Sequence, residues 1–193
     1  LDSLLEPTGN IKRAQEMGLP HYPVFTHKHH TDVSYLACAH ALLAAPDAIY
    51  PQFATHNAAT IAAILQMGAK SGAPFELQRL HGMGEGVYRE VLATDPDLPL
   101  RVYAPVGEHR DLLAYLVRRL LENGANSSFV NRIADENIAL EELVEDPVRS
   151  VERMAAIDGG VLGVPHPAIA LPRGLYGAAR PNSRGLDLAD ERT

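Results

Sequence analysis

The sequence predicts an α/β fold, a partial (βα) barrel of the TIM type, and three observations lead to it. Four short runs rich in β-branched and aromatic residues recur along the chain, and their first residues lie 27, 26 and 25 positions apart. A helical pattern follows each run. Strands that alternate with helices in this way are typical of parallel βα units. Because a closed barrel of eight units takes about 250 residues, we expect about four parallel strands, or half a barrel.

The residue patterns give each strand and helix its range. β-branched and aromatic residues favour strands, whereas apolar residues three and four positions apart indicate amphipathic helices. The predicted strands are Tyr22–Thr26, Ile49–Phe53, Phe75–Arg79 and Leu100–Ala104, and the predicted helices that follow them are Asp32–Leu43, Ala58–Gly68, Gly84–Leu92 and Asp111–Gly124.

The first residues of the chain do not fit a βα unit. Asn10–Met17 has the pattern of a helix with Asn10 as its N-cap. A strand should precede this helix, yet residues 1–9 show no period-two alternation and contain Pro7 and Gly9. We expect residues 1–9 to be an atypical N-terminal segment, and the expected strand to be missing or replaced.

The character of the chain changes after the last predicted barrel helix. Ile138–Glu142 has the pattern of a short helix, and Asp146–Ala156 that of a longer one, with Asp146 as N-cap and Pro147 in the first position. From Asp158 onward, prolines and glycines interrupt a stretch without periodicity. We therefore expect residues 10–135 to form the barrel part, and residues 136–193 a helix and an extended connector toward a following domain.

Composition and charge restrict the class of protein. The 193 residues are 46% hydrophobic with a mean hydropathy of −0.10, which is typical of a soluble globular protein with a sizeable core. The formal net charge of −7 and the isoelectric point near 5.7 argue against DNA or RNA as the main partner.

Cysteine usage and hydropathy favour a cytoplasmic location. Cys38 is the single cysteine, so it forms no internal disulfide, and we expect it to be a small core residue in a reducing compartment. No apolar run approaches the roughly 20 residues that span a bilayer, and the first residues lack the pattern of a signal peptide. Peripheral contact with the inner membrane stays open.

The predicted helix Asp111–Gly124 has two different flanks. At 3.6 residues per turn, one flank is an apolar stripe that we expect to pack, formed by Leu113, Leu116, Val117 and Leu120. Beside it lie an aromatic ring, two cations and a carboxylate, from Tyr115, Arg118, Arg119 and Glu122. Arg118 and Glu122 could form an ordinary surface ion pair. Alternatively, the adjacent arginines could bind a carboxylate or phosphate, with Tyr115 as a wall of the site.

Polar and aromatic side chains follow the predicted strands. In a parallel barrel the ligand site lies at the carboxyl ends of the strands. There the sequence places Phe25, Thr26, His27, Lys28, Thr55, His56, Asn57, Gln78, Leu80, His81 and Tyr103. Most of these are neutral hydrogen-bonding groups or rings, which suit a planar ligand rich in heteroatoms. Neither the carboxylate pair of a glycosidase nor a nucleophile with an ordered base is present, and we assign no catalytic acid or base.

Histidines cluster directly after the first predicted strand. His27, His29 and His30 lie in four consecutive residues, but adjacent histidines on a loop cannot easily all face one ion, and no zinc motif accompanies them. We expect solvated loop residues here and no metal site. Gly82 and Gly84 form a weak glycine pattern that we interpret as a βα turn.

Five motifs in order resemble the bacterial bifunctional proline utilisation family, which joins a proline dehydrogenase barrel to an aldehyde dehydrogenase domain. They are YPVFTHKHHTDVSYLACA from residue 22, IYPQFATHNA from 49, FELQRLHGMGE from 75, RVYAPVG from 101 and YLVRRLLENGANSSFVNRI from 115. The resemblance covers residues 11 to 133, the C-terminal half of the barrel. The tail LYGAARPNSRGLDLADE from residue 175 resembles the connector toward the aldehyde dehydrogenase domain.

This resemblance implies an FAD enzyme that oxidises L-proline to Δ1-pyrroline-5-carboxylate, with a quinone as electron acceptor. It implies that Arg118 and Arg119 bind the proline carboxylate and that Tyr103, Tyr115 and Leu80 line the substrate site. The flavin contacts that it implies are Phe25, Thr26, Thr55, His56, Asn57, Gln78, Arg119, Glu122, Ser128 and Phe129.

The resemblance also implies partners outside this chain. We expect the N-terminal half of the barrel and the downstream aldehyde dehydrogenase domain to belong to the full-length protein, and we expect this chain alone to lack activity. Two alternatives remain from the residues themselves. One is a non-catalytic fragment or interaction module, and the other is a different barrel enzyme that binds a small anionic substrate at the arginine pair.

Overall fold

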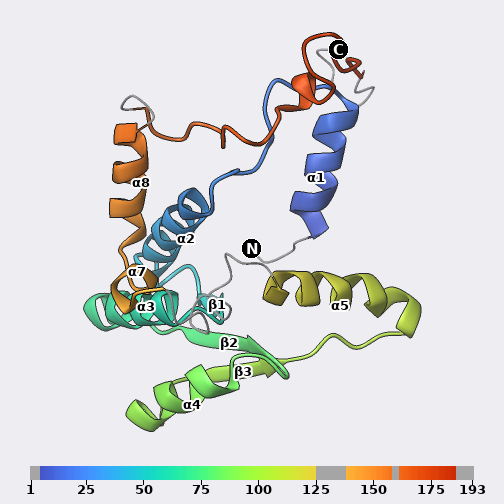
Figure 1. Cartoon of the computed structure of the whole chain (residues 1–193). Coiled ribbons are helices and arrows are strands. Elements are labelled where there is room, and N and C mark those ends of the chain that lie inside the picture. The colour runs from blue at the N-terminus through green and yellow to red at the C-terminus, as the bar shows by residue number, and fades with distance from the viewer. Residues whose placement is uncertain (1–4, 125–137, 158–160, 186–193) are drawn as a thin grey trace. The chain divides into compact units, whose positions relative to one another are not determined.

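The computed structural model describes residues 5–124, 138–157 and 161–185 (Figure 1). The chain divides into two compact units. The sheet unit comprises residues 32–146, and the terminal unit comprises residues 1–31 together with 147–193. The helices are α1 (Leu5–Glu16), α2 (Lys28–Leu43), α3 (Ala58–Ser71), α4 (Glu85–Thr94), α5 (His109–Gly124), α7 (Leu140–Leu143) and α8 (Pro147–Ile157), with the 3-10 helix η1 (Pro172–Gly174).

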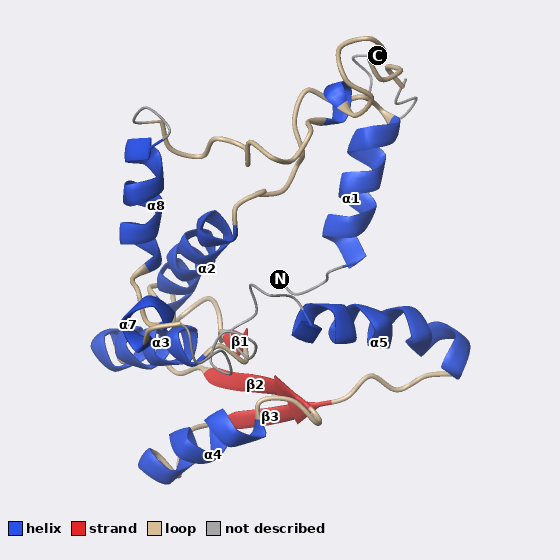
Figure 2. Ribbon diagram, viewed as in Figure 1, coloured by secondary structure: helices blue, strands red, loops and turns tan. Residues whose placement is uncertain are grey.

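The sheet unit is built on three parallel strands in sequence order (Figure 2). They are β1 (Gln52–Ala54), β2 (Glu76–Leu80) and β3 (Leu100–Tyr103). β2 lies in the middle and pairs on both sides, with Phe53 opposite Leu77 and Leu80 opposite Tyr103. α3 connects β1 to β2 and α4 connects β2 to β3, so the parallel α/β fold class predicted from the sequence is confirmed.

One face of this sheet forms the hydrophobic core. Phe53 and Leu77 are opposite each other in the register, point to the same face and are almost completely buried. Ile61 and Ile64 of α3 and Tyr88 of α4 belong to the same buried cluster. Burial of these side chains holds both helices against the sheet, and the polar face of the sheet is left for the site described below.

The predicted strand Tyr22–Thr26 is wrong, because this segment is neither helix nor strand. Pro23, its second residue, has no backbone N–H to donate to a neighbouring strand. The segment bonds instead to the connector: the Tyr22 hydroxyl donates to the Ala170 carbonyl oxygen at 2.9 Å, and the His166 backbone N–H donates to Thr26 Oγ1 at 2.8 Å. The described residues therefore contain three strands rather than about four.

The start of the first helix also differs from the prediction. α1 begins at Leu5, so Asn10 lies inside the helix and is not its N-cap. Pro7 is tolerated because the first four N–H groups of a helix have no partner within it. β1 begins three residues later than predicted, after Pro51, whereas α8 begins at Pro147 as predicted. Within residues 161–185, the connector contains one short 3-10 helix.

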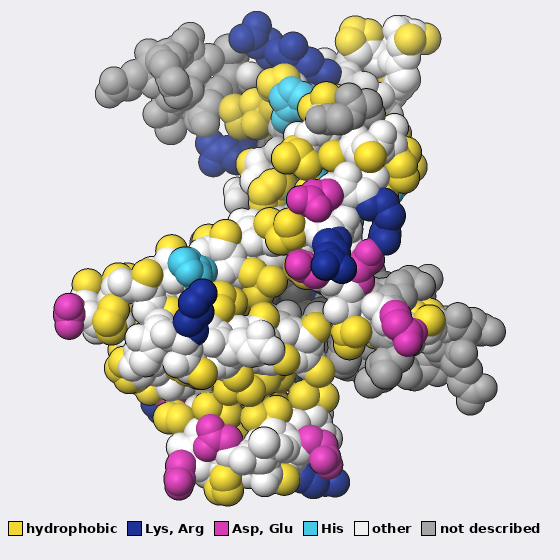
Figure 3. Space-filling view, turned by 90° about the vertical axis from the view of Figure 1, so that its left-hand side faces the viewer, with side chains coloured by type: hydrophobic (Ala, Val, Ile, Leu, Met, Phe, Trp, Pro, Cys, Tyr) yellow, Lys and Arg dark blue, Asp and Glu magenta, His cyan; other side chains and the backbone are white. Residues whose placement is uncertain are grey.

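Two expectations about burial are wrong. The stripe on α5 that we expected to pack is exposed, with Leu113 at 50% and Leu120 at 70% of its full accessible surface. The described elements leave that face of α5 open. Cys38 lies on an exposed side of α2 rather than in the core. Hydrophobic side chains are also prominent on the face of the molecule shown in Figure 3.

No described helix is long and apolar enough to cross a membrane.

Candidate functional site at the strand ends

The carboxyl ends of the strands bring several predicted site residues onto one face of the sheet. Leu80 pairs with Tyr103 at the last residues of β2 and β3. Gln78, two residues before Leu80, faces the same side because successive side chains of a strand alternate. This is the face opposite the core. The predicted substrate wall, Leu80 and Tyr103, and the predicted flavin contact Gln78 therefore lie on one surface.

His56 connects the end of β1 to the end of β2. Its Nε2 accepts a hydrogen bond from the Leu80 backbone N–H at 3.1 Å, which requires the neutral ring with its proton on Nδ1. The ring lies against Gly84, where a Cβ would come within 2.8 Å of His56 Cδ2. Gly84 also has a φ of 68°. The predicted glycine turn is thus a position where both the ring and the backbone favour glycine.

Asn57 has a structural role that the resemblance alone does not indicate. It is the N-cap of α3, and its side-chain oxygen accepts from the backbone N–H groups of Ala59 at 2.9 Å and Thr60 at 3.4 Å. Thr55 Oγ1 in turn accepts from the Asn57 backbone N–H at 3.2 Å. These bonds hold the β1–α3 turn and thereby position His56 at the strand end.

Tyr88 of α4 joins the same two strand ends from the core side. Its hydroxyl lies 2.7 Å from the Thr55 carbonyl oxygen and 3.1 Å from the Gln78 carbonyl oxygen, so one proton is shared between two acceptors. Burial raises the pKa of the Tyr88 phenol above its ordinary value. Sequence reasoning missed this residue, because nothing in the helical pattern of α4 indicates that its tyrosine reaches two strands.

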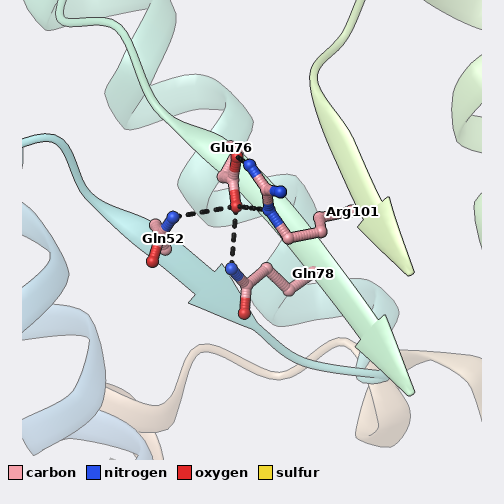
Figure 4. Close-up of polar contacts among 4 residues, drawn as sticks. All are labelled: Gln52, Glu76, Gln78 and Arg101. Carbon is pink, nitrogen blue, oxygen red and sulfur yellow. Dashed lines mark hydrogen bonds and ion pairs between the residues drawn. The ribbon is translucent and has the colours of Figure 1, made fainter. Parts of the chain in front are cut away.

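A buried carboxylate at the start of the central strand β2 organises the polar side chains around it (Figure 4). Glu76 is only 4% exposed. Its Oε1 accepts from Gln52 Nε2 at 3.0 Å, Gln78 Nε2 at 2.7 Å and Arg101 Nε at 2.7 Å, and its Oε2 accepts from an Arg101 terminal nitrogen at 2.8 Å. Hydrogen bonds from Arg101 and Gln78 lower the pKa of Glu76 from 4.5 to about 2, against the effect of burial.

The low pKa of Glu76 predicts a loss of stability in acid. Because the folded-state pKa lies below the ordinary value of 4.5, the carboxylate stabilises the fold above about pH 4.5, and this contribution disappears as the pH falls toward 2. In urea unfolding of the chain, the stability difference between wild type and Glu76→Gln should be largest near neutral pH and shrink below pH 4.5. Glu90→Gln, on the exposed surface of α4, controls for the change in net charge. A difference that does not change with pH would contradict this assignment.

α5 brings Tyr115 and Arg119 together. The Arg119 guanidinium carbon lies 5.3 Å from the centre of the Tyr115 ring, a cation–π distance, and Arg119 is 7% exposed. Arg118 is half-buried beside it. Glu122 lies in the last turn of α5, and its side chain is outside what the structure describes, as are Ser128 and Phe129.

In the terminal unit, histidine rings gather around His27. This ring is 6% exposed, and its centre lies 5.0 Å from that of His29, 5.3 Å from that of His30 and 4.7 Å from that of His166. The expectation of solvated loop residues is wrong, because α2 begins at Lys28 and the connector brings His166 against His27. Within the described ranges, no group of three or more potential ligands has a geometry that could hold a metal ion.

Phe25 and Thr26, which the resemblance assigns to the flavin, also lie in the terminal unit. Both line a cavity of about 360 Å³ together with His30 and residues 163–165 of the connector. The Phe25 ring packs edge-on against His30 with the centres 5.9 Å apart. The predicted site residues therefore fall into three groups, on the sheet, on α5 and in the terminal unit.

The three-stranded parallel sheet, with a helix between each pair of successive strands, is the arrangement expected of part of an α/β barrel. The proline dehydrogenase family model matches residues 8–132. The chain belongs to the proline dehydrogenase family.

Relatives and solved structures agree with this family. The bifunctional protein PutA of Klebsiella aerogenes and that of Escherichia coli K12 are each 61% identical to this chain over 187 residues, which is 94% of the chain and 14% of either relative. A crystal structure of Bradyrhizobium japonicum proline utilization A (PutA) superposes with a TM-score of 0.80 at 52% identity, over 93% of this chain and 18% of that protein. The chain thus spans about a seventh of the length of these curated relatives.

Proline dehydrogenases use a flavin, and the residues at the strand ends fit one. A flavin ring has an apolar fused system with N–H and carbonyl groups along its edge. On the polar face of the sheet, the side-chain amide oxygen of Gln78 makes no hydrogen bond with any described residue, whereas its Nε2 donates to Glu76. The amide oxygen is therefore available to an N–H donor, and the partly exposed Tyr103 lies on the same face at the end of the neighbouring strand.

Proposed function

We propose that this chain contributes the substrate-binding half of a site that oxidises L-proline to Δ1-pyrroline-5-carboxylate with FAD. The observation that carries the proposal is the buried Arg119 guanidinium stacked on Tyr115, with Arg118 adjacent to it on the same helix. A planar guanidinium donates two parallel hydrogen bonds to a carboxylate, and such charge-assisted bonds are among the strongest in proteins.

The roles of the residues follow from their chemistry. Arg118 and Arg119 would bind the proline carboxylate and fix the position of the small ring, and Tyr115 holds the Arg119 guanidinium in place through its ring. Leu80 and Tyr103 would line the substrate site. Gln78, Thr55 and His56, with Phe25 and Thr26 and with Glu122, Ser128 and Phe129, would hold the flavin.

The reaction removes two electrons and two protons from proline. A hydride leaves the ring carbon next to the nitrogen, the nitrogen loses its proton, and a carbon–nitrogen double bond forms. The flavin supplies the oxidant when it is bound, and a quinone would reoxidise it. The protein's contribution is to bind, orient and shield the ring, since the chemistry belongs to the cofactor. Because quinones are lipophilic, peripheral contact of the full-length protein with the inner membrane is part of this proposal.

The division of the chain into a barrel part and a connector is also part of the proposal. Residues 10–135 would complete a barrel whose N-terminal half belongs to the full-length protein, and residues 136–193 would lead toward an aldehyde dehydrogenase domain. A flavin across the top of a barrel draws contacts from both sides, and each lost hydrogen bond costs about 1 kcal/mol. We therefore expect the isolated chain to bind FAD weakly or not at all.

A chimera tests the proposal, with this chain in place of the matching 187-residue segment of Escherichia coli PutA. We expect the purified chimera to be yellow, to release FAD rather than FMN on denaturation, and to reduce a soluble quinone when L-proline is added. The isolated chain serves as the control for flavin content. A folded chimera that contains no flavin would contradict the proposal, as would a chimera that binds flavin but does not reduce the quinone when L-proline is added.

A further inference from the structure

Gln78 and Glu76 meet on the polar face of β2, two residues apart and on the same side (Figure 4). We propose that Glu76 is a positioning residue, which orients the Gln78 amide so that its carbonyl oxygen points away from Glu76 and accepts a hydrogen bond from an N–H group of the flavin. This inference rests on the proposed function, because it assigns a role to a residue of the same site.

The chemistry of the pair fixes the direction of the amide. An ionised carboxylate only accepts hydrogen bonds, and hydrogen bonds from Arg101 and Gln78 lower the pKa of Glu76 to about 2, so it is ionised at neutral pH. The Gln78 amide must therefore turn its NH₂ group toward Glu76, with Nε2 at 2.7 Å from Oε1. Because the amide is planar, its carbonyl oxygen then lies on the opposite side, as Figure 4 shows.

Arg101 and the backbone of β2 hold this arrangement in place. Arg101 contacts both carboxylate oxygens of Glu76, at 2.7 and 2.8 Å, and so prevents the carboxylate from rotating. The backbone of Gln78 is fixed separately, since its carbonyl oxygen accepts from the Tyr88 hydroxyl and from the Thr55 N–H. The remaining freedom of Gln78 is in its side chain, and Glu76 removes it.

Glu76 thus selects what Gln78 can recognise. A free glutamine amide presents either a donor or an acceptor by a half-turn about its last bond. An amide held by a carboxylate presents only the acceptor, and this matches an N–H group on a ligand. The strand register, with Gln52 opposite Glu76 and Arg101 opposite Gln78, assembles these groups from three strands.

A double-mutant cycle in the chimera, with the dissociation constant of FAD as the readout, tests this role. We expect Gln78→Leu to weaken FAD binding about tenfold, which corresponds to one hydrogen bond of about 1.4 kcal/mol. Glu76→Gln should weaken it by about twofold, because a second amide at position 76 accepts either orientation of Gln78 and leaves about half of the amides with the acceptor exposed. The double variant should bind FAD as weakly as Gln78→Leu alone, without a further twofold loss, since the two residues act through one bond.

Gln52→Leu is the matched control. Gln52 donates to the same Glu76 oxygen at 3.0 Å, but it lies at the start of β1, away from the strand ends. We expect its FAD affinity to stay equal to that of the unmodified chimera, although its thermal stability falls. Glu76→Asp, which keeps the charge but withdraws the carboxylate by one methylene, should weaken FAD binding like Glu76→Gln and provides a second variant if the latter does not fold.

Losses of FAD affinity that add in the double variant would show that Glu76 affects FAD binding only through the stability of the fold. A loss of FAD affinity in Gln52→Leu equal to that in Glu76→Gln would show the same. Unchanged FAD affinity in Gln78→Leu would overturn the inference and leave the proposed function intact, because the chimera would still bind flavin. Failure of the unmodified chimera to bind flavin would instead overturn the proposed function, and with it this inference.

Discussion

Arg119→Met is expected to raise the KM of the chimera for L-proline at least tenfold. Met keeps the length of the side chain and suits a helix, but it removes a charge-assisted hydrogen bond worth about 1.5–3 kcal/mol. Arg119 is the buried arginine of the pair, and its guanidinium lies over the Tyr115 ring, which restricts its orientation. Initial rates measured against L-proline concentration give the KM directly.

Two further variants serve as comparisons for the KM of Arg119→Met. Arg118→Met should raise the KM in the same direction, because both guanidiniums are assigned to one carboxylate. Arg110→Met, in the exposed first turn of the same helix, should leave it unchanged. Unchanged saturation by proline in both Arg118→Met and Arg119→Met would remove the arginine pair from the substrate site.

Tyr88→Ala is expected to destabilise the sheet unit by about 3–5 kcal/mol, the range for deletion of a large buried aromatic side chain. Tyr88 is 1% exposed and lies in the core cluster. Tyr88→Phe removes only the hydroxyl shared by the Thr55 and Gln78 carbonyl oxygens, and should cost about 1–2 kcal/mol. Urea unfolding of the chain, or hydrogen exchange of the strand amides, measures both changes.

Tyr50→Phe provides the control for Tyr88. Tyr50 is half exposed, so loss of its hydroxyl should change the free energy of unfolding by less than about 0.5 kcal/mol. If Tyr88→Phe were as stable as the unmodified chain, the hydroxyl would not link the two strand ends, and the position of Gln78 would need another explanation.

The parallel sheet could be predicted because its signals are local. Phe75–Arg79 and Leu100–Ala104 combine β-branched or aromatic residues with suitable spacing, and both form strands within one residue of the predicted bounds. Tyr22–Thr26 has a similar composition, but Pro23 removes the donor that a strand in a sheet needs. The composition of this segment thus favours a strand, whereas its hydrogen-bonding capacity does not.

The predicted site residues at the ends of β1, β2 and β3 follow from strand position alone, since the last residues of parallel strands gather at one edge. The parts that could not be predicted depend on contacts between strands or between segments far apart in the sequence. Glu76 is organised by Gln52 on β1 and Arg101 on β3. His166 reaches His27 from the connector. Similarly, the periodicity of α5 predicts its apolar stripe but contains no information about what covers it.

We propose that this chain supplies the proline carboxylate clamp and part of the flavin site of a proline dehydrogenase. Anaerobic titration of the chimera with L-proline, followed by the visible absorbance of the flavin, tests it most directly. We predict that L-proline bleaches the bound flavin and that Arg119→Met moves the midpoint of this reduction to at least tenfold higher proline concentration. Flavin that is bound but stays oxidised at saturating L-proline in the chimera, or a midpoint unaffected by Arg119→Met, would contradict the account.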